Sequence, residues 1–122
     1  MAEYTVTINL PDHKRGDKWL GIASIGPVLI DGAQPAAALS RVKMNFRHSK
    51  GTIYRLDTDA TLRDAPIVIS NATTWAANIP AVQSFLPVAG VWNWDMEFYA
   101  AGDTAPLTLY QGAMTVHDDI TR

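Results

Sequence analysis

Two carboxylates lie two residues apart in the segment GVWNWDMEFYA, residues 90–100. If this segment is a β-strand, Asp95 and Glu97 point to the same face. A pair of carboxylates on one face is the arrangement with which glycosidases perform acid–base and nucleophilic chemistry. The flanking sequence offers no apolar pocket that would activate either group, and the solvent-facing sides of strands are commonly charged. We therefore interpret Asp95 and Glu97 as a solvated strand face.

Three histidines, His13, His48 and His117, are further candidates for chemistry. No two of them have the short spacing of metal-binding histidine pairs. His117 is followed directly by Asp118 and Asp119, a combination able to bind a cation weakly. Because these residues follow the last expected strand, we favour a charged segment over a metal site and predict neither metal nor cofactor.

Two other groups of charged residues invite a functional interpretation. The RGD tripeptide at residues 15–17 suggests cell adhesion, but it precedes an expected strand and no secretory signal is visible, so we interpret it as a turn. Arg41, Lys43 and Arg47 form a basic stripe that could meet phosphates or an acidic partner, although we favour a solvated strand face that also carries Asn45. The sequence contains no P-loop, GxGxxG or GxSxG motif. We expect no catalytic site.

The amino-acid composition restricts the class of protein and the kinds of partner that the chain can have. The 122 residues fit one domain, 1–122, and 48% hydrophobic with 18% charged residues is ordinary for a globular chain. The absence of cysteine excludes disulfides and thiolate metal sites. The net charge of −2 argues against a dedicated nucleic-acid binder. No apolar run approaches the roughly 20 residues that cross a bilayer, so we expect neither nucleic acid nor a membrane as partner.

Apolar and polar residues alternate with a period of two in many short segments, which glycine, proline and aspartate separate. This pattern predicts seven or eight short strands without a long helix, in an antiparallel β-sandwich or small barrel. Residues 49–51 predict a hairpin turn, the alanines after Pro35 fit one helical turn, and residues 73–80 could extend the preceding strand. The expected strands cover residues 4–10, 19–25, 40–48, 52–58, 65–70, 90–100 and 107–116.

Each strand has one apolar face, which must be buried between two stacked sheets. The apolar face of the N-terminal strand would consist of Tyr4, Val6, Ile8 and Leu10. Two central strands would contribute the heaviest set, Val42, Met44, Phe46, Trp92, Trp94, Met96 and Phe98. Trp92 and Trp94 could instead form a ligand platform, but we favour the core.

Five segments follow one another in a characteristic order: RGD at 15–17, DGAQPAAAL at 31–39, the alternating strand from Val42 to Arg47, LPVAGVWNWDME at 86–97, and LYQGAMTVHDDIT at 109–121. In this order the chain resembles the small Ig-like domain of tailed-phage virion proteins, and it is similar to the N-terminal domain of baseplate upper proteins. The resemblance implies an Ig-like antiparallel β-sandwich with a structural role and no catalytic residues.

In baseplate upper proteins this domain begins a longer chain, whereas the sequence here stops at Arg122. The resemblance therefore implies an adaptor or decoration subunit of the virion, made in the bacterial cytoplasm, rather than a direct receptor binder. We expect a tail or baseplate component that binds other phage structural proteins as copies in a symmetric assembly. Capsid decoration or a neck role for the same fold, and a carbohydrate-binding module with tryptophans as the sugar platform, are the alternatives.

Aromatic residues and methionine, which are enriched at interface cores, are numerous in this chain. An open edge on either terminal segment could pair with a neighbouring protein, or these segments could fold back on their own domain. The proline-containing connection 79–90 is a third expected contact surface. The candidate interface residues are Met1, Ala2, Glu3, Tyr4, Pro80, Phe85, Pro87, His117, Asp118, Asp119, Ile120, Thr121 and Arg122.

Overall fold

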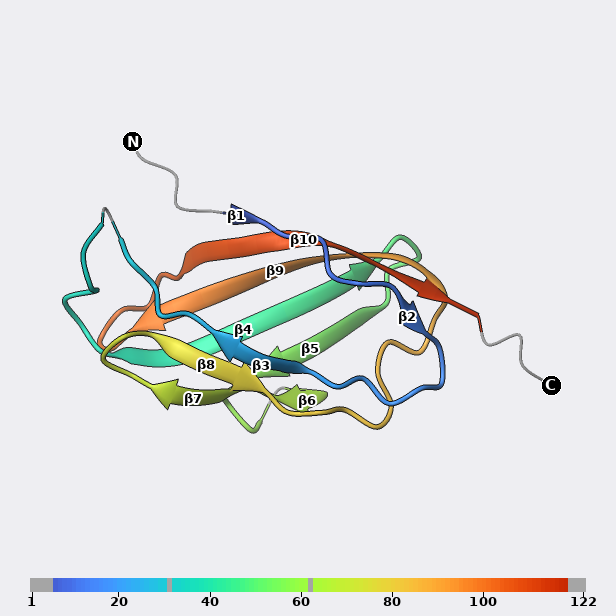
Figure 1. Cartoon of the computed structure of the whole chain (residues 1–122), viewed down its shortest axis with the longest axis horizontal. Coiled ribbons are helices and arrows are strands. Elements are labelled where there is room, and N and C mark those ends of the chain that lie inside the picture. Colours follow the sequence, from blue (N-terminus) through green and yellow to red (C-terminus); the bar gives the residue numbers. More distant parts are fainter. Residues whose placement is uncertain (1–5, 31, 62, 119–122) are drawn as a thin grey trace.

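A computed structural model describes residues 6–30, 32–61 and 63–118 (Figure 1). These ranges contain β-strands and no helix, so the predicted all-β class is confirmed. The strands are β1 (Val6–Thr7), β2 (His13–Lys14), β3 (Ile22–Ile25), β4 (Leu39–His48), β5 (Ile53–Asp57), β6 (Ala65–Pro66), β7 (Val68–Asn71), β8 (Ala76–Ile79), β9 (Gly90–Ala100) and β10 (Leu107–His117).

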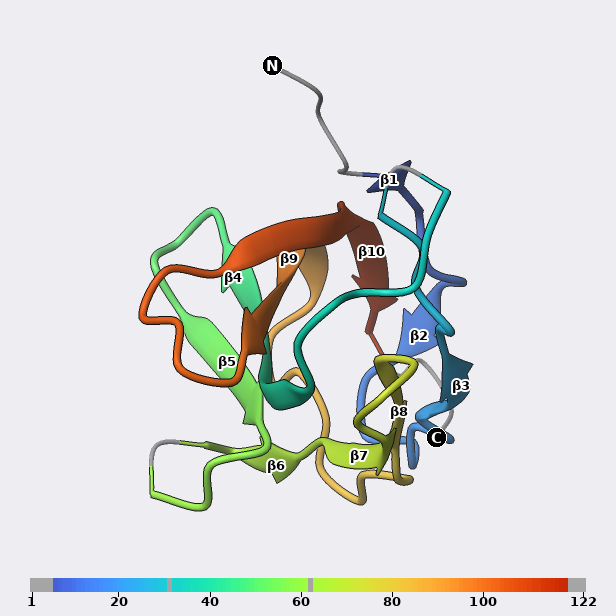
Figure 2. The same ribbon diagram turned by 90° about the vertical axis from the view of Figure 1, so that its left-hand side faces the viewer.

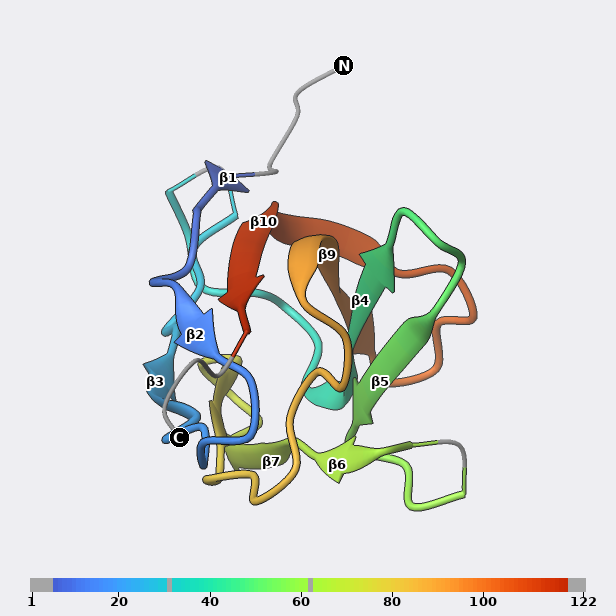
Figure 3. The same cartoon turned by 90° about the vertical axis from the view of Figure 1, so that its right-hand side faces the viewer.

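The strands form two sheets. The larger has the order β1-β10-β9-β4-β5-β6, with β2 also pairing with β10, and the smaller has the order β3-β8-β7. Views from the two ends show the larger sheet curving over the smaller one (Figures 2 and 3). The chain passes between the sheets at Ile67, the single residue between β6 and β7.

The pairing is mixed rather than purely antiparallel. The long pairs β4·β5, β4·β9 and β9·β10 are antiparallel, whereas the short strands β1 and β2 run parallel to β10, and β6 runs parallel to β5. Of the described part of the predicted first strand, residues 6–10, only Val6–Thr7 is strand. The chain nevertheless follows β10 further, since the backbone N–H groups of Ile8 and Leu10 donate to the carbonyl oxygens of Gln111 and Ala113, at 2.7 and 3.0 Å.

Three local expectations have different outcomes. The hairpin turn at 49–51 is confirmed, with Gly51 at a φ of +92° between the antiparallel strands β4 and β5. Residues 73–80 do not extend the preceding strand but return as β8 beside β7, because the Asn71 side-chain oxygen accepts hydrogen bonds from the N–H groups of Thr73 and Thr74 and closes a turn. The predicted helical turn after Pro35 is wrong, since this stretch is an irregular loop.

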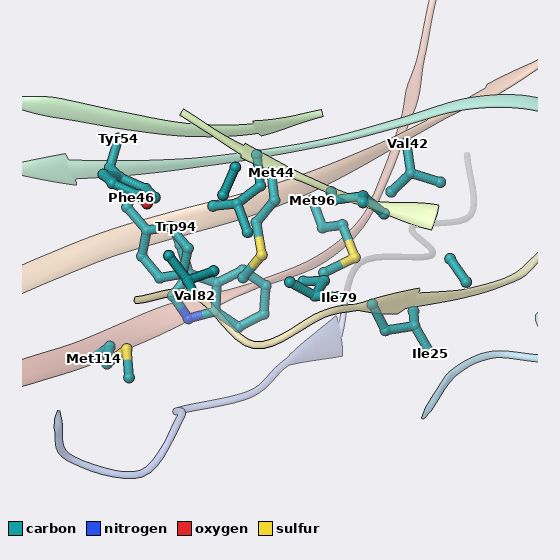
Figure 4. Packing of buried hydrophobic residues seen from close by; sticks show 14 of the residues in the cluster. Ile25, Val42, Met44, Phe46, Tyr54, Ile79, Val82, Trp94, Met96 and Met114 are labelled. Carbon is teal, nitrogen blue, oxygen red and sulfur yellow. The ribbon is translucent and has the colours of Figure 1, made fainter. Parts of the chain in front are cut away.

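The core lies between the sheets. All seven residues expected there from β4 and β9 are buried, and Figure 4 shows Met44, Trp94 and Met96 near Ile79 of the smaller sheet. The indole N–H of Trp92 donates to the Val88 carbonyl oxygen at 2.8 Å, which satisfies the polar atom of a fully buried ring. The expected inward face of the N-terminal strand is wrong for Val6 and Ile8, which are exposed because they lie at the margin of the larger sheet, beyond β10.

Candidate binding surfaces

The two carboxylates of β9 lie on the outer face of the larger sheet, as the alternation predicts. Asp95 stands between Gln111 and Asn45 of the neighbouring strands, and Glu97 is paired with Lys43 on β4. One Asp95 oxygen accepts a hydrogen bond from Arg47 at 2.8 Å, while the other is enclosed and has no hydrogen-bond partner. Asp95 is therefore fixed by an ion pair rather than simply solvated.

The basic stripe on β4 does not present three free cations. Arg41 forms a two-point contact with the Asp57 carboxylate, with Nε to Oδ1 at 2.9 Å, and Asp57 is only 2% exposed. The hydrogen bonds to Asp57 raise the pKa of Arg41, and its guanidinium also lies over the ring of Tyr99. Because carboxylates of neighbouring strands pair with Arg41 and Arg47, the stripe is not suited to binding phosphate.

Asn45 departs from the expected solvated face. It belongs to the outward-facing positions of β4 but is only 7% exposed, and its side-chain oxygen has no hydrogen-bond partner. Its cross-strand neighbours are Asp95 and Arg55. At the centre of the outer face, polar side chains are therefore partly shielded from solvent.

A hollow of about 450 Å³ opens on this outer face where β1, β10 and β9 meet the end of β4. The polar side chains around it come from residues far apart in the sequence, namely Thr7, Asn9, Arg47, Asn93, Asp95 and Gln111. β10 also contributes Gly112 and Ala113. The short side chain of Ala113 leaves space open, whereas the Ile8 carbonyl oxygen occupies the place that a side chain at Gly112 would take. The short side chain of Ala113, among longer polar side chains of β4, β9 and β10, thus contributes to the hollow.

The wall formed by residues 7–9 is held in place by hydrogen bonds to β10. The Asn9 side-chain oxygen accepts from the backbone N–H of Ala113 at 3.1 Å, and the Gln111 amide lies 3.5 Å from the Thr7 hydroxyl. On the opposite wall the Arg47–Asp95 ion pair fixes both side chains. The arrangement presents amide, hydroxyl, carboxylate and guanidinium groups in one place.

A second, apolar groove of about 200 Å³ lies between residues 8–10 and the edge strand β3. Ile8 and Leu10 line one side and Ile22 lines the other, with Trp94 and Met96 among the remaining lining residues. The Trp94 indole N–H is buried and has no hydrogen-bond partner. The groove lies on the side of the sandwich where β10 of the larger sheet and β3 of the smaller sheet are neighbours but do not pair through hydrogen bonds.

The four tryptophans do not form an exposed platform. Trp75, Trp92 and Trp94 are buried, and Trp19 is half-buried with its ring stacked on Phe85 at 4.0 Å between centroids. The alternative of a sugar platform built from exposed tryptophans is therefore wrong. The interpretation of Trp92 and Trp94 as core residues is confirmed.

The charged segment after the last strand meets the RGD turn. Gly16 has a φ of +93°, and the N–H of Asp17 donates to the Lys14 carbonyl oxygen at 3.1 Å, so the tripeptide forms a turn as predicted. Arg15 then pairs with Asp118 at 2.9 Å. His117 contacts Asp12 at 2.7 Å, and Asp119 lies outside the described residues. His117 and Asp118 thus bind different side chains, and no group of three or more potential metal ligands occurs in the part that the structure describes.

The other two histidines contribute to packing. His48 is buried with both ring nitrogens engaged: Nδ1 accepts from the Lys50 N–H at 3.1 Å, and Nε2 lies 3.0 Å from the Ala89 carbonyl oxygen. His13 is buried edge-on against Phe85, and burial lowers its pKa.

The expected interface residues are divided by the structure. Pro80, Pro87, His117 and Asp118 are exposed, whereas Met1 to Tyr4 and Asp119 to Arg122 lie outside the described residues. The prediction that Phe85 is an accessible interface residue is wrong, because it is 3% exposed and its ring packs against Trp19, Phe46 and Tyr54. The terminal strand β10 is not an open edge, since β1 and β2 pair along it. As far as it is described, the N-terminal segment folds back on its own domain.

The polar hollow was missed by the sequence interpretation. Thr7, Asn93 and Gln111 stand at outward positions of three separate strands, and only the register between these strands brings them together.

No protein-family model matches the sequence, and no curated protein is matched either. No helix in residues 6–30, 32–61 and 63–118 is long and apolar enough to cross a membrane. The candidate sites accordingly rest on the geometry of this chain.

Proposed function

We propose that the protein is a non-enzymatic structural component of a phage or prophage virion, located in the tail or baseplate and built as an Ig-like β-sandwich. In this role it binds other virion proteins and is present as several copies in a symmetric assembly. In this proposal the protein functions through binding surfaces rather than through a catalytic site.

The strand order is the observation that carries this proposal. In variable-type immunoglobulin domains one sheet contains strands G, F, C and C′ and the other contains B, E and D. The order β10-β9-β4-β5 beside β3-β8-β7 follows the same scheme, with β3 as strand B and β10 as strand G. Cysteines that would link strands B and F are absent, and Ile25, Trp94 and Met96 instead fill the space between β3 and β9.

The contact between the RGD turn and the end of β10 supports the resemblance to phage virion domains. Both segments belong to the ordered features that carry the resemblance, and they lie about a hundred residues apart in the sequence. The Arg15–Asp118 ion pair brings them together beside β2. The two features can therefore act as one structural unit at this end of the sandwich.

Exposed apolar side chains beside β3 are suited to a protein partner. Leu20 is 78% exposed and Leu29 is 66% exposed, and they flank β3, which is an edge strand of the smaller sheet. A neighbouring protein could cover these side chains and also pair with the strand edge through backbone hydrogen bonds. We assign this surface, residues 20–29, as the assembly surface.

The location can be tested on intact particles. Phage or prophage particles from the encoding strain would be purified on a density gradient and analysed for this chain by quantitative mass spectrometry. We expect a fixed ratio of the chain to the tail proteins, and antibody label at the tail end in electron micrographs. Label on the head or neck would support the alternative virion locations. Absence of the chain from particles that contain both head and tail proteins would refute a virion role.

A further inference from the structure

We propose that the hollow on the outer face of the larger sheet binds a neutral saccharide through its hydroxyl groups. This ligand site is independent of the assembly surface, because it lies on the opposite layer of the sandwich from β3. It also differs from the tryptophan platform excluded above, since six of its lining side chains are polar and the ring of Trp94 is buried.

Cross-strand register gives the hollow two parallel rows of side chains, all of them polar except Ala113. One row runs from Thr7 through Gln111 to Asp95, and the next contains Ala113, Asn93 and Arg47. Neighbouring strands are about 4.8 Å apart, and alternate residues along a strand are about 7 Å apart. Hydrogen-bonding groups at these separations can reach several hydroxyls of one sugar ring at the same time.

The charge of the hollow favours an uncharged ligand. Arg47 and Asp95 are ion-paired to each other at 2.8 Å, so their charges largely cancel. The remaining polar groups are the amides of Asn9, Asn93 and Gln111 and the hydroxyl of Thr7. An amide offers donors and an acceptor side by side, and a sugar hydroxyl both donates and accepts. A phosphate or a metal ion would find no such match.

The lining also argues against a protein occupant. Interface centres are built around aromatic or large apolar anchors. Apart from Trp94, whose indole lies in the core (Figure 4), the only apolar side chain among the lining residues is the half-buried Ala113. Without a stacking ring the affinity of one site is low, and repeated copies in an assembly would raise it by avidity. This last point alone rests on the proposed function.

The test uses the purified, isotope-labelled full chain in NMR titrations. Neutral oligosaccharides selected on an array of several hundred glycans would be added, with an acidic galacturonate oligomer and a polar peptide as comparison ligands. We expect saturable shifts with a neutral saccharide, confined to the backbone amides of Thr7, Asn9, Asn93, Asp95 and Gln111. Asn93→Ala and Gln111→Ala should each weaken binding about tenfold, because each removes hydrogen bonds made to the ligand.

Ser70→Ala on β7 is the matched control, because Ser70 is exposed on the smaller sheet. The affinity of this variant for the saccharide should be unchanged. Lack of binding across the array, shifts only outside the hollow, or binding only of the acidic oligomer or the peptide would each overturn the proposal. The titration uses free protein, so its result is separate from whether the chain is found in virions.

Discussion

Gly112 on β10 lies directly beneath Ile8: a Cβ atom at position 112 would stand 1.7 Å from the Ile8 carbonyl oxygen. Such a contact is impossible without movement of the backbone, so residue 112 must be glycine for the N-terminal segment to follow β10. The φ of Gly112 is not positive, and the requirement is therefore one of space rather than of backbone conformation. The same contact positions Thr7 and Asn9 at the hollow.

Gly112→Ala should displace residues 6–10 from β10 and destabilise the protein by about 1–3 kcal/mol, the usual cost of overpacking. Urea denaturation measures the change in the free energy of unfolding. Hydrogen exchange at the amides of Ile8 and Leu10 reports whether the segment has left the sheet. Thr115→Ala on the outward side of β10 is the control and should change stability by less than about 0.5 kcal/mol. Unchanged protection at Ile8 in Gly112→Ala would contradict this account.

Trp92→Ala should be among the most destabilising single changes. The ring is fully buried, packs edge-on against His48, and donates its N–H to Val88. Truncation leaves a large cavity and an unsatisfied carbonyl oxygen, with an expected loss of about 3–5 kcal/mol measured by chemical denaturation. Trp19→Ala is a useful comparison, because Trp19 is only half-buried and should cost less. Equal losses for the two variants would show that burial does not determine the effect.

The ion pair between Arg41 on β4 and Asp57 on β5 should give a large coupling free energy between the two side chains. Asp57 is almost fully buried, so Arg41→Met would leave its carboxylate without its ion-pair partner and destabilise the protein by about 3–5 kcal/mol. The double variant Arg41→Met, Asp57→Leu removes both charges and should lose less than the sum of the two single variants. A double-mutant cycle in urea measures this coupling. Additive losses would mean that the two side chains do not depend on each other.

Much of this fold is accessible from alternation alone, because burial on one side of a strand imposes a period of two. Met44, Trp92 and Phe98 are assigned to the core by that pattern, and the hairpin at Gly51 follows from turn chemistry. Phe85 is misassigned, because the prolines around it indicate a loop while the packing of its ring onto Trp19 arises only in the folded chain.

The hollow could not be predicted for a different reason. Asn93, Gln111 and Thr7 are unremarkable polar residues on outward positions, and their proximity depends on register. Register between β1 and β10 is set by a parallel contact across more than a hundred residues, for which local sequence carries no signal beyond the glycine at 112. Long-range parallel pairing is thus the step at which sequence patterns become insufficient.

His13 should make stability depend on pH. Burial lowers its pKa below the ordinary value of 6.5, while Asp17 partly opposes this shift. As the pH falls below 6.5 the unfolded chain takes up a proton that the folded chain does not, so stability is complete above that pH and declines until the folded pKa is reached. Denaturation between pH 8 and about 5 should show a smaller decline for His13→Leu than for the native chain. Asp17→Asn should enlarge the decline, because the charge favouring protonated His13 is removed; no difference among the three proteins would refute this role.

Leu20 and Leu29 should matter for assembly and not for folding. Both side chains are largely exposed, so Leu20→Ser and Leu29→Ser should change the free energy of unfolding by less than about 0.5 kcal/mol. If residues 20–29 are the assembly surface, the double variant loses buried apolar contact with its partner and its copy number in purified particles falls severalfold. Val91→Ser is the matched control, because Val91 is also an exposed apolar residue but lies on β9 of the other sheet. Quantitative mass spectrometry of particles from strains carrying each variant makes the comparison. Normal incorporation of the leucine double variant would exclude this surface, and equal losses for all variants would indicate that surface polarity in general, rather than this site, governs incorporation.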